Sequence, residues 1–367
     1  MAIGTTKNTD TIPRVIPWRQ IGMTALIIFC ILFLAVPFWE VLLQMIANPQ
    51  LLMRQLLIGF TNGAYIALIA LGYTLVYGIV ELINFAHGDV YMLGAFMSLT
   101  LIGLFGLTTK TPMEIRIPLM VVILLITMAF TAGLNYSIER LAYRRLRNAP
   151  RLAPLISAIG VSFMLQNVGL LWGYLRLPAL NGVMGTNAVA PKNFPGLIPN
   201  TNMTPADLGI RFTIKEFVVL VIAFALLAAL YLFIQRTRAG KAMRATAQDR
   251  DAAALMGIDV NRTISLAFLL GGALAGAAGM LVGLYNGTAL FSMGFTAGLY
   301  AFTAAVLGGI GNVTGAMLGG LFIGLISSLS DQYISATWTP AVIFGVLVII
   351  LVFRPLGLLG EEGGQKA

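Results

Sequence analysis

The sequence predicts an all-α integral membrane protein that crosses the bilayer many times. Hydrophobic residues make up 58% of the 367 residues and charged residues only 10%, against about 25% charged in an ordinary soluble domain. The apolar residues form continuous runs of about 20 residues, the length of a membrane-spanning helix, and not the alternating pattern of a transmembrane barrel. The chain has room for about eight to ten such helices.

The basic residues favour a membrane protein and not a nucleic-acid-binding one. The formal net charge is +9, but Lys and Arg cluster between apolar runs, as the positive-inside rule requires. Residues 1–20 and the arginine-rich segment 139–151 are therefore expected in the cytoplasm. The first apolar run, 21–46, is too long for a signal-peptide core and is interpreted as a retained span. Four expected spans separate the two basic segments, which agrees with a shared location.

The spans follow one another along a single transmembrane domain, 1–367. In order they are expected at 21–46, 51–80, 89–107, 117–138, 152–175, 217–234, 263–285, a region 286–330 broken by glycines, and 340–353. The broken region could hold two shorter spans or a re-entrant pair. The basic stop at Arg354 places the tail 354–367 in the cytoplasm and favours ten membrane segments over nine.

Two long polar connections are expected on opposite sides of the membrane. The segment 176–215 is rich in Pro, Asn and Gly and should be external. Loops of this length are usually functional or disordered, so it is either a docking surface for an external protein or a plain surface loop. The basic segment 235–262 follows the next span and should be cytoplasmic.

Polar residues interrupt the apolar sequence between the second and third spans. Glu81, Asn84, His87 and Asp89 lie between hydrocarbon-like runs, and His87 is the only histidine. Ionisable groups at membrane depth usually face a cavity, a partner helix or a water-filled path. Asn84, His87 and Asp89 are therefore candidates for a translocation path. The alternative is a hydrogen-bonded structural pair that holds a helix break, or an interfacial turn on the cytoplasmic side.

The same stretch carries a family resemblance. The runs ALIALGYTLVYG at 67–78 and INFAHGDVYMLGA at 83–95 resemble the permease subunits of branched-chain amino acid ABC importers, and urea and amide importers carry similar segments. The resemblance implies a bacterial inner-membrane protein with a second, related permease subunit, so that the permease core is a heterodimer. It further implies cytoplasmic ABC ATPase subunits that hold ATP and Mg²⁺, and a periplasmic substrate-binding protein.

The basic segment 235–262 contains a candidate coupling element. Residues 251–258 (DAAALMGI) can form a short helix that Gly257 ends. This run resembles the Glu-Ala-Ala-x-x-x-Gly signature by which ABC importer permeases couple to their ATPases. The resemblance assigns coupling to Asp251 (in the glutamate position), Ala252, Ala253 and Gly257, while the later Ile-x-Leu-Pro part is missing. The alternative is an ordinary basic loop that satisfies topology.

Glycines spaced four residues apart predict close packing between helices in lipid. They are Gly272 and Gly276, Gly279 and Gly283, and Gly311, Gly315 and Gly319. The glycine- and asparagine-bearing interruptions at 84–94 and 311–320 also favour two inverted repeat halves, as in many transporters.

The chain lacks the motifs of an enzyme. The Gly-Lys pair at 240–241 has Gln235 and Ala242 where a phosphate loop needs Gly and Ser or Thr, so ATP hydrolysis is expected only in partner subunits. One histidine and one cysteine support no metal site or hydrolytic triad. No cofactor is expected in this chain, and membrane lipid is an expected partner. Two rivals remain open: an ion-coupled secondary amino acid transporter, and a passive channel for urea or amides.

Overall fold

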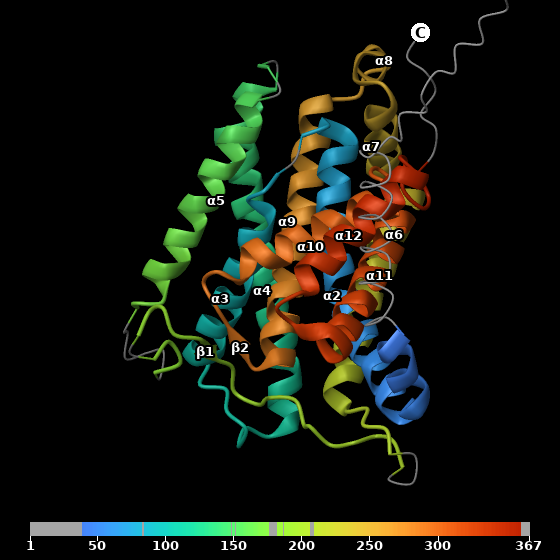
Figure 1. The fold of residues 1–367 in the computed structure, drawn as a ribbon. Helices are drawn as coiled ribbons and strands as arrows, with labels where there is room; N and C mark the ends of the chain where they lie inside the picture. The colour runs from blue at the N-terminus through green and yellow to red at the C-terminus, as the bar shows by residue number, and fades with distance from the viewer. Residues whose placement is uncertain are drawn as a thin grey trace, which may run out of the picture. The chain divides into compact units, whose positions relative to one another are not determined.

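The structure is a computed structural model that describes residues 39–82, 84–147, 149–150, 152–175, 182–185, 187–205 and 209–360. It divides the chain into two units, 1–49 and 50–367. In the first unit residues 39–47 are helical, and most of the predicted span 21–46 lies outside the described residues. In the second unit helices make up nearly all regular structure (Figure 1), which confirms the all-α class.

The long helices of the second unit match the predicted spans in order. They are α2 (Pro49–Val80), α3 (His87–Leu104), α4 (Met113–Ile138), α5 (Leu152–Trp172), α6 (Ile214–Arg236), α9 (Val260–Asn286), α10 (Met293–Gly308), α11 (Val313–Ser330) and α12 (Thr339–Phe353). Among the described residues, seven helical stretches are long and apolar enough to cross a membrane, while α10 and α12 are shorter. The glycine-broken region therefore forms two separate helices.

Two basic segments predicted as loops are largely helical. The segment after α4 continues as a π-helix, η1 (Glu139–Tyr143), and a 3₁₀ turn, η2 (Arg144–Leu146). It stays helical because Ile138 and Tyr143 are buried against the bundle and hold it in place. The segment after α6 forms α7 (Arg238–Gln248) and α8 (Arg250–Leu255). The sequence predicted only one short helix there. It gave no signal for α7, because the buried residues of α7 (Gly240, Met243 and Thr246) do not form an apolar run.

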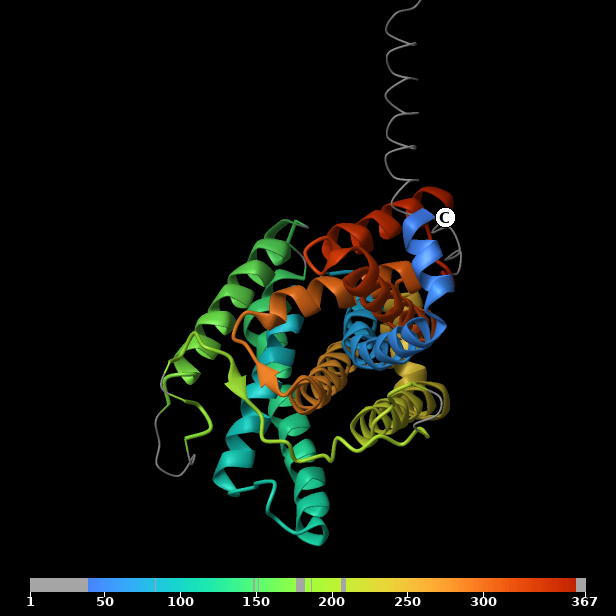
Figure 2. The same cartoon turned by 60° about the horizontal axis from the view of Figure 1, so that its bottom comes forward.

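The two ends of the second unit carry different structures. At one end, the α8 end, Arg250 of α8 donates a hydrogen bond to Ile79 O at the end of α2 (2.9 Å). At the other, the β1 end, the short strands β1 (Lys192–Asn193) and β2 (Thr288–Ala289) pair antiparallel just after α9. Residues 187–205 cross this end between α5 and α6 (Figures 1 and 2). A π-helix, η5 (Asp331–Ser335), extends α11.

A buried lysine ties the segment after α5 together at the β1 end. The ammonium of Lys192 donates to Met184 O (2.7 Å), Asn187 O (2.6 Å) and Gly173 O (3.3 Å). Its side chain is buried, and burial lowers the pKa of Lys192. Three carbonyl oxygens offset part of the cost of removing this ammonium from water. The carbonyl groups of Gly173, Met184 and Asn187 are thus bound to Lys192 at the start of β1.

Glycines bring three central helices, α3, α4 and α9, into backbone contact. A Cβ on Gly94 of α3 would lie 2.7 Å from the Cα of Gly276 in α9, and a Cβ on Gly276 would overlap Thr131 of α4. Gly272 meets the Thr131 carbonyl in the same way, at 2.5 Å. Small residues allow such close approach in membrane helices. At the remaining glycines of the spaced set an added Cβ would overlap Tyr91 O (Gly279), Phe194 (Gly283), Gly308 O (Gly315) and Ala304 O (Gly319), whereas Gly311 has room.

This packing predicts that an added methyl group at Gly276 lowers stability. Gly276→Ala should destabilise the protein by about 1–3 kcal/mol, because Thr131 is branched at Cβ and cannot move away without backbone shifts. Gly133→Ala in α4 is the matched control, since its Cβ would meet nothing within 4 Å and alanine favours a helix by about 0.5–1 kcal/mol. Thermal unfolding in detergent compares the two, and equal Tm values would contradict the packing argument.

Candidate functional site

The chain between α2 and α3 turns back into the interior of the bundle. Glu81 follows α2 with φ +55°, the left-handed region, and α3 begins six residues later at His87. An added Cβ on Gly72 would overlap the His87 imidazole. Gly72 lies eight residues before the end of α2, which is about 12 Å along a helix. The start of α3 therefore lies inside the bundle.

His87 packs against α2. Its ring lies edge-on to Tyr73 with centroids 4.9 Å apart, and it is 1% exposed. Neither imidazole nitrogen has a hydrogen-bond partner among the described residues. His87 and Asp89 therefore do not form the hydrogen-bonded pair that the sequence left open.

Asp89 faces α5 on one side and α10 on the other. Its Oδ2 accepts a hydrogen bond from Ser162 Oγ of α5 (2.5 Å), and Gln166 donates to the same Ser162 oxygen (3.3 Å). A Cβ added to Gly294, at the start of α10, would lie 2.7 Å from Asp89 Oδ1. Oδ1 has no hydrogen-bond partner in the described part of the chain. A buried carboxylate oxygen is thus held at the crossing of α3 and α10.

Asn84 connects the turn to α4 and α9. Its Oδ1 accepts a hydrogen bond from the Tyr143 hydroxyl in η1 (2.7 Å), and its Nδ2 lies 3.4 Å from Asn135 Oδ1. Asn135 in turn donates to Phe268 O of α9 (2.7 Å). Partners from η1, α4 and α9 thus satisfy these buried polar groups, as a low-dielectric interior requires.

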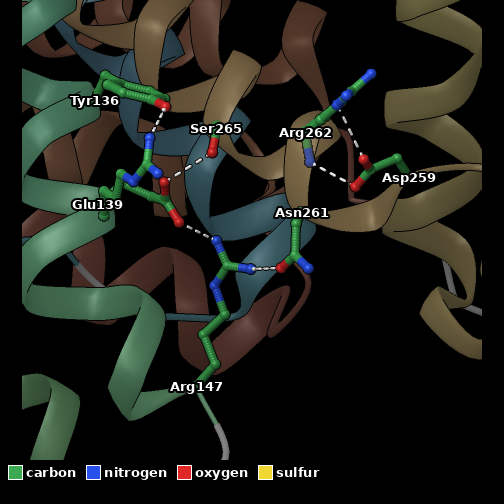
Figure 3. Close-up of polar contacts among 8 residues, drawn as sticks. Tyr136, Glu139, Arg147, Asp259, Asn261, Arg262 and Ser265 are labelled. Atoms are coloured by element: carbon green, nitrogen blue, oxygen red, sulfur yellow. Dashed lines mark hydrogen bonds and ion pairs between the residues drawn. The ribbon is translucent and has the colours of Figure 1, made fainter.

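A second polar network joins η1 to the start of α9 at the α8 end (Figure 3). Glu139 of η1 is fully buried and forms an ion pair with Arg147. Its Oε2 accepts a hydrogen bond from Ser265 Oγ of α9 (2.8 Å), and Arg147 donates to Asn261 Oδ1 (2.7 Å). Burial lowers the pKa of Arg147, while the neighbouring Glu139 carboxylate raises it. The end of α4 and the start of α9 are thereby joined.

The α8 segment presents an exposed apolar tip. Asp249 caps the helix by accepting hydrogen bonds from the backbone N–H groups of Asp251 (2.8 Å) and Ala252 (2.9 Å). Gly257 ends the segment with φ +82°, a conformation that favours glycine. Leu255 and Met256 between them are 89% and 83% exposed. Ala253 is the buried residue of the helix.

Two connections join α8 to the 81–89 turn. Arg250 in α8 donates directly to Ile79 O, two residues before Glu81. The indirect connection passes through α9, which Asp259 caps by accepting a hydrogen bond from Arg262 N (3.0 Å). Ser265 near the start of α9 donates to Glu139 of η1. Tyr143, also in η1, donates to Asn84 in the turn. A displacement of α8 would therefore reach the turn by a direct and an indirect route.

The predicted path residues do not form one cluster. Asn84, His87 and Asp89 face α4, α2 and α5 respectively. The hydrogen-bond partners of Asn84 and Asp89, which are Asn135, Tyr143 and Ser162, were not predicted from the sequence. Glu139, Arg147 and Arg250 of the neighbouring connections were not predicted either. Asn135 and Glu139 could have been found, because each lies in or next to an apolar run, whereas a lone serine in a helix gives no signal.

The spaces beside the turn are small. The void next to Asn84 and Tyr143 and the one next to Tyr73 and Phe302 are each about 10 Å³, the room of about one water molecule. An amino acid could not pass either of them without a rearrangement.

Residues 55–352 match the family described as branched-chain amino acid transport system / permease component. The chain is 41% identical over 320 residues to the high-affinity branched-chain amino acid transport system permease protein BraD of Pseudomonas aeruginosa, covering 86% of this chain and 97% of that protein. It is 41% identical over 326 residues to the corresponding protein LivH of Escherichia coli K12, with the same coverage. No solved structure matches the chain.

The Asp89 contact predicts that Ser162 stabilises the fold. Ser162→Ala removes a donor from a buried carboxylate and should cost about 1–3 kcal/mol. Ser137→Ala is the control, since Ser137 is exposed and donates only to Gly133 O of its own helix. The Tm of Ser162→Ala should fall while that of Ser137→Ala stays near wild type. A Ser162→Ala protein as stable as the control would show that the contact carries no stability.

Proposed function

This chain belongs to the family of branched-chain amino acid transport system permease components, and we propose that it is the permease subunit of an ATP-driven importer. Its apolar helices and its relatives make it a multi-pass membrane protein. We place it in a bacterial inner membrane with the N-terminus in the cytoplasm.

The proposed orientation puts the α8 end in the cytoplasm and the β1 end outside. The arginines of 139–147 and of 236–262 all lie at the α8 end, as expected for cytoplasmic loops. The 176–215 segment then faces outward, where a periplasmic binding protein could dock. In this arrangement 1–367 acts as a single permease domain that pairs with a second, related permease subunit.

The exposed tip of α8 is the observation that carries the proposal. A short helix that presents Leu255 and Met256 to solvent suits insertion into a groove of a soluble partner. Two adjacent exposed apolar side chains at the end of a capped, glycine-ended helix offer an apolar contact that a soluble partner would cover. We assign the partner as a cytoplasmic ATPase that holds ATP and Mg²⁺, so that Asp251, Ala252, Ala253 and Gly257 shape the docking helix.

Coupling would then proceed through the two connections described above. Binding of ATP to the partner moves α8, and the Arg250 link and the Glu139–Arg147 network pass the displacement to the 81–89 turn. Because packed interfaces are bistable and not continuously deformable, the turn would switch between two packings. Asn84, His87 and Asp89 line the place where the path closes.

A charge at the tip of α8 should uncouple transport. In proteoliposomes with the ATPase, second permease and binding protein, Leu255→Asp should lower ATP-dependent leucine uptake about tenfold or more, the loss expected at a hot-spot contact. Ala247→Asp adds the same charge at an exposed position of α7 and should transport normally. Uptake by Leu255→Asp at the wild-type rate would contradict the docking assignment, and uptake that a protonophore abolishes at constant ATP would indicate an ion-coupled transporter instead.

Removing the Arg250 link should leave docking intact and impair transmission. Arg250→Met keeps the length of the side chain but cannot donate to Ile79 O, so ATP hydrolysis should continue while uptake falls. The ratio of leucine transported to ATP hydrolysed measures this directly. The same ratio in Arg250→Met and wild type would rule out the direct route.

A further inference from the structure

A polar cavity opens at the β1 end, away from the turn and from α8. Its volume is about 380 Å³, within the range of small-molecule sites. Three helices and the connection before α6 form it: α2 contributes one face, α6 its first turn, α9 its last residues, and the connection contributes Asn200, Arg211 and Thr213. The lining residues used below are Arg54, Ile58, Asn62, Arg211, Lys215 and Glu216.

Three cationic side chains line this cavity. Arg54 comes from α2, Arg211 from the loop and Lys215 from the start of α6. Within the described part of the chain, none of the three forms an ion pair or a hydrogen bond. Lys215 interacts electrostatically with the neighbouring Glu216 carboxylate. A bound anion would give the guanidinium groups of Arg54 and Arg211 a common charged partner.

The lining contains one carboxylate, Glu216, and only one of its two oxygens accepts hydrogen bonds from the described residues. Glu216 Oε2 accepts hydrogen bonds from Thr213 N (2.5 Å) and Thr213 Oγ1 (2.9 Å) in the capping box of α6. Its Oε1 accepts none among the described residues. The cavity thus offers one acceptor for a cation beside three donors for an anion.

We propose that this cavity binds the zwitterionic head group of a free amino acid at the external mouth of the permease. The carboxylate lies against Arg54, Arg211 and Lys215, and the ammonium against Glu216 Oε1. Ile58 is the one aliphatic residue of the lining, so the site recognises the head group and leaves the side chain free. This accounts for a site that accepts several branched side chains with one set of contacts.

The inference rests on the proposed function and locates its external site. The voids at the turn are each about 10 Å³, so in this conformation the mouth is open while the path is closed at the turn. A substrate held at the mouth waits until the turn switches.

Binding of L-leucine to the purified full chain in phosphatidylcholine nanodiscs tests the site by calorimetry. Arg54→Gln and Arg211→Gln should each weaken binding about tenfold or more, the effect of removing a hydrogen bond to a charged group. Lys110→Gln is the matched control, because Lys110 is an exposed base at the same end and outside the cavity. L-leucinamide, which lacks the carboxylate, should bind at least as weakly as L-leucine binds to the arginine variants.

Three results would overturn the assignment. Equal affinity for L-leucine and L-leucinamide would exclude recognition of the carboxylate. Wild-type leucine affinity in both arginine variants would exclude this cavity. The third result is that the wild-type protein binds glycerol phosphate but not leucine, and that both arginine variants lose this binding. It would identify a lipid headgroup site.

Uptake by the reconstituted complex separates this inference from the proposed function. If ATP-driven leucine uptake occurs but Arg54→Gln and Arg211→Gln bind leucine normally, only the site assignment fails. If leucine binds the cavity but the complex shows no ATP-driven uptake, the proposed function fails.

Discussion

The turn between α2 and α3 brings backbone and polar side chains into the interior of an apolar bundle, where protein groups must supply nearly all of their hydrogen bonds. Irregular backbone at membrane depth is tolerated only where protein or a water-filled cavity surrounds it. Here glycines supply the space: Gly72 leaves room for His87, and Gly294 leaves room for Gly88 and Asp89. The arrangement of the central helices follows from this requirement, because each must approach the turn closely enough to enclose it.

The same constraint gives the turn its connections. Asn84 and Asp89 are bound by Tyr143 and Ser162, which belong to different helices, so a change in helix packing must alter the turn. The Glu139–Arg147 pair adds a rigid joint at the end of α4. Breaking such a buried pair would leave an uncompensated charge and cost several kcal/mol, so α4 and α9 are expected to move together at this end.

The sequence allowed the helical class, the order of the spans and the location of the polar interruption to be predicted, because continuous apolar runs and isolated charges are local signals. The helical extension into η1 could not be predicted from local sequence. It depends on a hydrogen bond from the Tyr143 hydroxyl to Asn84, and these two residues are 59 positions apart in the chain. The partners of the path residues were hidden for the same reason. The cavity at the β1 end brings Arg54 together with Arg211 and Glu216, which lie 157 and 162 positions later in the chain, and no spacing in the sequence indicates that proximity. The inverted-repeat arrangement stays a prediction.

The central claim is that motion of α8 reaches the buried turn through Arg250. Spin labels on Glu81→Cys and Phe105→Cys, in a chain whose single native cysteine is replaced by serine, report the distance between the turn and the far end of α3. In the assembled complex the account predicts that ATP changes this distance, and that Arg250→Met abolishes the change. An identical ATP-dependent change in both backgrounds, or no change in either, would contradict it.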